Sequence, residues 1–148
     1  MKFRIFGLLV LLVGLFVVTG CTAPATPPEE NQALQASLDE LFTLSVKQSA
    51  AFESDDLVLV LNEVSDSRCP ADVQCIRAGE VVVKASVFKG EERLDDVTLQ
   101  LAVGDQVPAQ EGVGDYRIEL VEVTPYPKSG VAVTPEQYQV TFKVAKEQ

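Results

Sequence analysis

The sequence predicts an all-β domain, a small β-sandwich or barrel of six or seven strands. Short segments rich in Val, Ile, Leu and Thr recur after residue 42, and several alternate apolar and polar residues, as half-buried strands do. Turn-forming residues separate these segments, and no helical pattern intervenes. Such spacing over about 105 residues is typical of sandwiches and small barrels. The stronger strands are expected at 57–64, 80–89, 95–103, 115–123 and 136–145, and weaker ones at 42–46 and 49–53.

The first 20 residues have the features of a bacterial secretory signal peptide. A short basic region precedes an apolar run of about 14 residues, fewer than the roughly 20 that a membrane-spanning helix requires. Residues 18–21, VTGC, resemble the lipobox of bacterial lipoproteins. The resemblance implies cleavage before Cys21, lipidation of Cys21, and a lipid-anchored position in the bacterial cell envelope, facing the periplasm or the exterior. The alternative is an ordinary secretory signal that happens to end near a cysteine.

The chain that this processing would leave is strongly acidic. The full sequence has a net charge of −10, and removal of Lys2 and Arg4 with the signal peptide changes it to −12. Nucleic acid and anionic lipid headgroups repel such a domain. We therefore expect no nucleic-acid partner, contact with the membrane through the lipid anchor, and an envelope protein as the binding partner.

Residues 21–41 are expected to connect the anchor to a β-domain at 42–148. The segment TAPATPPEENQ, residues 22–32, contains no bulky apolar side chain and is typical of an extended tether. Three leucines with helical spacing follow it: Leu34, Leu38 and Leu41. This spacing predicts a short helix at the end of the connecting segment.

Two parts of the chain resemble each other weakly. FTLSVKQ followed by LVLVLNEV resembles LQLAVGDQ followed by YRIELVEV. In this alignment Leu44 corresponds to Leu101 and Leu61 to Leu120, and each half continues with a proline-containing loop and a further strand. Two explanations stay open: a duplicated three-strand unit, or the general likeness of half-buried strands. Under duplication, the two loops occupy equivalent positions.

The first of these loops, SDSRCPADVQCIRAG at 65–79, contains Cys69 and Cys75 with five residues between them. A structural zinc site needs about four N or S ligands, and the chain has no histidine, so we predict neither metal nor cofactor. Thioredoxin-like redox motifs have two residues between their cysteines, near a βαβ pattern that is missing from this sequence. In an exported protein the pair favours a disulfide, which would stabilise the fold by about 2 kcal/mol.

The same segment resembles a hairpin found in an uncharacterised bacterial family of secreted proteins and lipoproteins. The family pattern DSRCP-x-x-V-x-C-x-x-A-G matches residues 66–79, and LVLVLNEV and LVEVTPYP also fit it, so the similarity covers most of 42–145. The resemblance implies a small, exported, all-β domain and no catalytic activity. Relatives usually carry an aromatic residue where this chain has Arg77, so an aromatic contact at that position does not carry over.

Four residues are candidates for binding a partner. Asp66, Arg68 and Arg77 place both signs of charge on the loop, and a rigid loop loses little entropy on binding. Tyr126, between two prolines, is an aromatic side chain that can anchor a partner. Structural alternatives stay open for each: Asp66 pairs with Arg68 or caps loop amides, Arg77 lies on solvent, and Tyr126 closes the end of the sandwich.

No catalytic residues are predicted. Without histidine, the Ser-His and Cys-His nucleophile systems are absent, and pairs of adjacent acids fall at predicted turns or strand starts, where water solvates them. The pairs are Asp55-Asp56, Glu91-Glu92 and Asp95-Asp96. We therefore expect a non-catalytic binding or envelope-structural module. The alternatives are a protease-inhibitor-like module acting through loops 65–79 and 124–130, and a hydrolase with two acids facing each other across a cleft.

Overall fold

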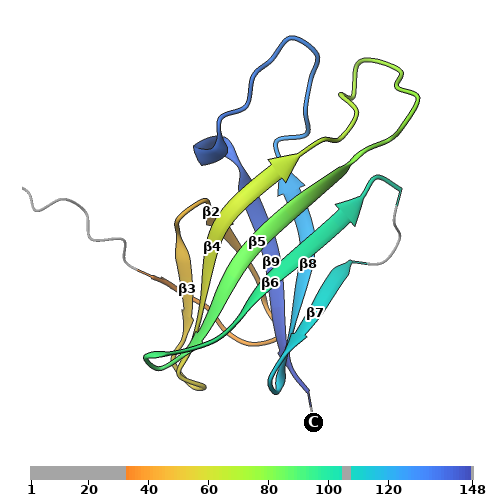
Figure 1. The fold of residues 1–148 in the computed structure, drawn as a ribbon. Coiled ribbons are helices and arrows are strands. Elements are labelled where there is room, and N and C mark those ends of the chain that lie inside the picture. The colour runs from red at the N-terminus through yellow and green to blue at the C-terminus, as the bar shows by residue number, and fades with distance from the viewer. Residues whose placement is uncertain (1–32, 105–107, 148) are drawn as a thin grey trace, which may run out of the picture.

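The computed structural model describes residues 33–104 and 108–147, so the predicted signal peptide, Cys21 and tether lie outside the described residues. Nine described strands form two facing sheets, which confirms the all-β sandwich (Figure 1). The strands are β1 (Leu34–Gln35), β2 (Leu41–Ser45), β3 (Ser49–Phe52), β4 (Leu57–Asp66), β5 (Glu80–Lys89), β6 (Glu92–Ala102), β7 (Ala109–Val113), β8 (Tyr116–Thr124) and β9 (Gln139–Lys146). The sequence prediction lacks β1 and β7.

The strand order is β1-β3-β4-β5-β6 in one sheet and β2-β9-β8-β7 in the other. β1 pairs with β3 in parallel, and the other pairs of strands are antiparallel. Alternate residues point into the space between the sheets, as the period of two requires. In the core between the two sheets, the centroid of the Phe42 ring lies 5.4 Å from that of Phe52 and 5.9 Å from that of Phe142.

The prediction of a short helix before the β-domain is wrong for the residues of that segment that the structure describes, from residue 33 onward. Leu34 lies in β1, opposite Ala50 of β3, and Leu38 lies in the turn before β2. The Ala36 N–H donates to the Ala51 oxygen (2.9 Å), so the edge of β3 supplies the backbone partners that a helix would otherwise supply internally. β1 therefore joins the first sheet although it lies before position 42, the predicted start of the β-domain.

The two halves of the chain have the same topology. The segments β2-β3-β4-β5 and β6-β7-β8-β9 each consist of one strand followed by a three-strand antiparallel meander. In each half the first strand crosses to the opposite sheet, where β2 pairs with β9 and β6 pairs with β5. The orders β6-β5-β4-β3 and β2-β9-β8-β7 are therefore equivalent. The repeating unit has four strands rather than three.

β-Bulges mark this equivalence within the strands. The β4–β5 pairing shifts register between Leu61 and Glu63, and the β8–β9 pairing shifts between Leu120 and Glu122. These are the positions that the sequence comparison aligned. A bulge bends and twists a strand, so the two meanders curve over the core at the same point along their length.

The sequence alignment is displaced by two residues in the first strand of each half. Leu44 lies opposite Val140, and its counterpart Leu99, rather than Leu101, lies opposite Val83. Val140 and Val83 occupy equivalent positions. Each is also paired, in its other neighbouring strand, with the first buried valine that follows the bulge of that strand. A shift of two residues keeps a strand's apolar face inward, so alternation alone does not fix this register.

Two connections leave the sandwich at the same end (Figure 1). Residues 67–79, between β4 and β5, form what we call the disulfide loop. Residues 125–138, between β8 and β9, form the proline loop, which includes the short 3-10 helix η1 (Pro135–Gln137). Because β4 and β8 are equivalent strands, the two loops occupy equivalent places, as the internal resemblance predicts under duplication.

Candidate functional site

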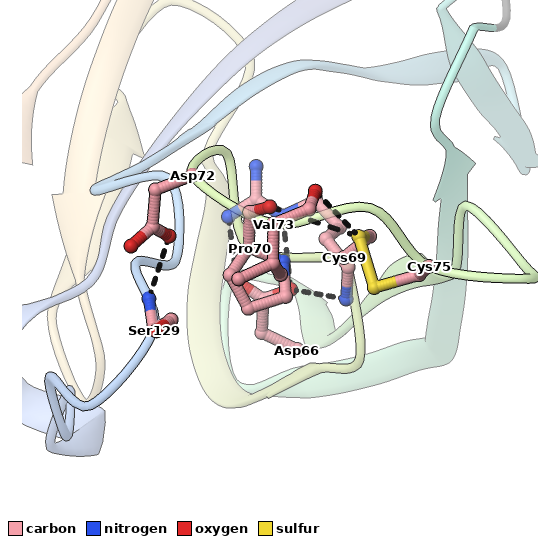
Figure 2. The surroundings of a disulfide bond; sticks show 8 residues. Asp66, Cys69, Pro70, Asp72, Val73, Cys75 and Ser129 are labelled. Carbon is pink, nitrogen blue, oxygen red and sulfur yellow. Dashed lines mark hydrogen bonds and ion pairs between the residues drawn. A yellow bond between two sulfur atoms is a disulfide. The ribbon is translucent and has the colours of Figure 1, made fainter.

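The two cysteines of the disulfide loop are bonded to each other, with their Cα atoms 5.9 Å apart, and the predicted disulfide is confirmed (Figure 2). The Cys69 N–H donates to the Ala78 oxygen (2.8 Å), which extends the antiparallel pairing of β4 and β5 beyond the ends of both strands. The loop is thus closed by a covalent bond and, next to it, by a backbone hydrogen bond. The cysteines therefore define the shape of the loop.

The return of the chain into β5 depends on Gly79. Its φ of 74° lies in the left-handed region that favours glycine. A Cβ atom at this position would lie 2.0 Å from the backbone oxygen of Ser67. The Ser67 N–H in turn donates to the Glu80 oxygen (2.9 Å), so the two backbone segments are held against each other. A side chain at position 79 would force them apart.

Asp66 and Arg68, both candidates for partner binding, form a buried ion pair with side chains 2% and 6% exposed. Arg68 Nη2 donates to Asp66 Oδ2 (2.6 Å), and Arg68 Nε donates to Asp66 Oδ1 (2.9 Å). The Arg68 backbone N–H also donates to Oδ1 (3.0 Å). This fork-to-fork arrangement is the strong form of an arginine–carboxylate contact. The structure therefore matches the structural alternative for these two residues, since neither side chain is open to a partner.

Arg68 also joins the disulfide loop to the proline loop. Its Nη1 donates to the Val123 oxygen (2.9 Å) and its Nη2 to the Pro125 oxygen (3.1 Å). The guanidinium carbon lies 4.5 Å from the centre of the Tyr126 ring, within cation–π distance. One arginine of the disulfide loop thus contacts a carboxylate at the end of β4 and backbone oxygens at and just beyond the end of β8, in the other sheet.

Two further hydrogen bonds connect the loops on the same side. The Ala71 N–H donates to the Pro127 oxygen (3.0 Å), and the Ser129 N–H donates to Asp72 Oδ1 (2.8 Å). The hydrogen bond from Ser129 holds the pKa of Asp72 below its ordinary value, and the positive charge of Lys128 adds to this effect. Figure 2 shows the hydrogen-bonded Asp72 and Ser129 to the left of the Cys69–Cys75 disulfide. The Asp72 arm of the loop is therefore the one that is braced.

Tyr138, at the end of the proline loop, lies close to the ion pair between Asp66 and Arg68. Burial raises the pKa of its hydroxyl, and the nearby negative charge of Asp66 raises that pKa further. The phenol therefore stays neutral well into alkaline solution. Its side chain belongs to the buried core, whereas the sequence pattern identified this position only as part of a strand.

Several apolar side chains remain exposed on the two loops: Val73, Ile76, Tyr126 and Val131. Ile76 is 105% exposed, so the residue is fully accessible to solvent. Tyr126 is 40% exposed because one face of its ring covers Arg68. Arg77 is exposed, which is compatible both with partner binding and with a side chain that only meets solvent. Sequence reasoning missed Ile76 and Val73; the available signal was an aliphatic residue within a loop otherwise composed of small and polar residues.

Two of the adjacent acids, Asp55 and Asp96, make polar contacts away from these loops. Asp55 Oδ1 accepts from Lys146 Nζ (2.6 Å) and from the Tyr116 hydroxyl (3.2 Å), and the Lys146 contact is the main cause of a lowered pKa for Asp55. Asp96 accepts from the Ser86 hydroxyl (2.6 Å) and pairs with Arg93. Within the described ranges, no three His, Cys, Asp or Glu side chains cluster as a metal site would require.

No protein family model, curated protein or solved structure matches this chain. Among residues 33–104 and 108–147, no helix has the length and apolar character needed to cross a membrane. The N-terminal sequence and the geometry of the two loops are therefore the sources of functional information.

Proposed function

We propose that this protein is a lipid-anchored lipoprotein of the bacterial cell envelope, and that its β-sandwich binds another envelope protein through the disulfide and proline loops. The supporting observation is the fully exposed Ile76 side chain on a closed and braced loop. Exposed apolar surface is unfavourable in water, and covering an isoleucine contributes about 1.5–3 kcal/mol to association. The loop thus carries an anchor for a partner and no machinery for catalysis.

The rigidity of the loops supports the same proposal. The disulfide, the close packing at Gly79 and the Arg68 contacts fix the backbone on both sides of the exposed residues. A preorganised loop loses little conformational entropy on binding, so more of the contact energy appears as affinity. Tyr126 and Arg77 add the two residue types, tyrosine and arginine, that are enriched among residues dominating the energy of protein interfaces.

The lipid anchor is supported by the N-terminal sequence. The apolar run and the VTGC motif place Cys21 where a lipoprotein carries its lipid. Two or more acyl chains hold a protein stably on a bilayer, whereas one gives only marginal binding. Treating producing cells with globomycin should make the unprocessed precursor accumulate, and mass spectrometry of untreated protein should show a lipidated Cys21. An unmodified protein released into the medium would contradict the anchor.

Site-specific crosslinking in intact cells tests the binding proposal. A photoreactive amino acid would replace Ile76 in one variant and Leu94 in another. Leu94 is also an exposed aliphatic side chain, near the start of β6 and therefore at the opposite end of the sandwich. We expect a distinct crosslinked product from position 76 and none from position 94. Identical products from both positions, or none from position 76, would argue against binding through the loops.

A further inference from the structure

The segment Ile76-Arg77 spans two fixed points of the disulfide loop. On one side, Cys75 is held by the disulfide. On the other, the Ala78 oxygen accepts the Cys69 N–H (2.8 Å), and Gly79 is packed against the backbone of Ser67. Only two residues separate these points, and both side chains are exposed. The peptide bond between Arg77 and Ala78 is therefore presented on a short, anchored stretch of chain.

Arg77 differs from the other arginine of the loop in having no internal partner. Arg68 is neutralised by Asp66, while Arg77 forms no hydrogen bond or ion pair with any residue that the structure describes. It is an exposed cation on a chain with a net charge of −10. A complementary partner would offer a pocket that binds a long cationic side chain. Trypsin-like serine proteases have such a pocket, with an aspartate at its base.

We propose that a trypsin-like serine protease binds the disulfide loop as it binds a substrate, with Arg77 in its acidic specificity pocket, and that this protein inhibits the protease. The inference rests on the proposed function, because it names a partner for the same loop. Ile76 precedes the specificity residue and would add apolar contact beside the pocket. Preorganised protease–inhibitor contacts of ordinary size are among the tightest known.

The same anchoring explains why binding would inhibit rather than lead to rapid degradation. Attack by the protease serine on the Arg77 carbonyl carbon forms an ester, breaks the Arg77–Ala78 bond, and transfers the serine proton to the Ala78 amine. The disulfide holds the Arg77 side of the break, and the Cys69 and Ser67 contacts hold the Ala78 side. The amine therefore stays beside the ester at high effective concentration, which favours re-formation of the peptide bond over hydrolysis.

The test uses the full chain, purified in detergent and titrated against active-site-calibrated trypsin. We expect tight inhibition of trypsin and none of chymotrypsin. Arg77→Ala should weaken inhibition by about 30-fold or more, the loss typical of a residue that dominates an interface, while Arg77→Lys should retain most of it because lysine also fits an acidic pocket. Arg93→Ala, which removes another half-exposed arginine at the far end of the sandwich, should change nothing. Matching thermal midpoints would show that each variant is folded.

Two results would overturn the inference: absence of trypsin inhibition, or rapid cleavage after Arg77 followed by full recovery of trypsin activity. Equal losses in Arg77→Ala and Arg93→Ala would also overturn it. Crosslinking from position 76 separates this failure from failure of the proposed function. A crosslinked envelope protein without trypsin inhibition would leave the binding proposal standing and remove the protease, whereas absence of both would remove both.

Discussion

The disulfide loop and the proline loop occupy equivalent places in the two halves of the sandwich, yet they are stabilised by different means. The disulfide loop has its own covalent bond and its own close-packed glycine. Among the described residues, three groups of the disulfide loop contact the proline loop: the Arg68 guanidinium, the Ala71 N–H and the Asp72 carboxylate. The two loops therefore brace each other, but only the disulfide loop also carries a covalent closure of its own.

Truncation of Arg68 should produce the largest loss of stability. Arg68→Ala leaves Asp66 buried without its partner and removes the hydrogen bonds to the Val123 and Pro125 oxygens. Loss of one member of a buried ion pair typically costs about 3–5 kcal/mol. Urea unfolding followed by far-UV circular dichroism would measure it. Arg68→Lys should recover only part of the loss because lysine lacks the two-pronged geometry. A loss under about 1 kcal/mol, the value for an exposed pair, would contradict the buried brace.

A pair of glycine substitutions compares the two loops directly. Gly79 and Gly130 have similar φ values, 74° and 72°, but only at Gly79 would a Cβ meet other atoms within 4 Å. Gly130→Ala should cost about 1–2 kcal/mol from its backbone conformation alone. Gly79→Ala should cost more than about 3 kcal/mol because the Ser67 backbone must also move. Equal losses in the free energy of unfolding, measured in urea, would show that the close approach at Gly79 does not add to the cost of the substitution.

Removal of the disulfide should have an intermediate effect. Replacing Cys69 and Cys75 together with serine should lower the free energy of unfolding by about 2 kcal/mol, as loop-closure entropy predicts for so short a ring. The Arg68 contacts do not involve the sulfurs, so the proline loop should keep its amide chemical shifts. Large shift changes throughout the proline loop would instead show that its order depends on the disulfide.

Acidification should break the contact between Asp72 and Ser129 with the smallest effect on stability. The hydrogen bond from Ser129 lowers the pKa of Asp72, so this contribution is present above the ordinary carboxyl value of 3.8 and is lost as the pH falls through the lower folded value. The Ser129 amide resonance should therefore titrate with a midpoint below 3.8. In Asp72→Asn this transition should disappear. A midpoint at or above 3.8 would mean that the carboxylate does not accept this hydrogen bond.

The sequence predicted those features that depend on local pattern or on counting. Alternation identified the longer strands, and two cysteines in a chain that we predict to be exported indicated the disulfide. The internal resemblance identified equivalent loops, with an error of two residues at Leu99 because alternation repeats every two residues.

The features that the sequence did not predict depend on tertiary contacts between distant parts of the chain. An Asp-x-Arg spacing is equally compatible with a solvated pair and with the buried pair at Asp66 and Arg68, because burial depends on backbone oxygens of β8 that are more than 50 residues away. The edge strand β1 likewise exists only because β3 offers unpaired backbone groups. Val73 and Ile76 escaped attention because isolated aliphatic residues in a loop form no periodic pattern.

We propose that the exposed end of the disulfide loop binds a protein while its base maintains the structure. A single variant, Ile76→Asp, tests this most directly when capture of envelope protein in intact cells and the free energy of unfolding are both measured. We predict that capture is lost while the free energy of unfolding stays within about 0.5 kcal/mol of the unmodified chain, as for other exposed substitutions. Unchanged capture, or capture lost only together with stability, would contradict the claim.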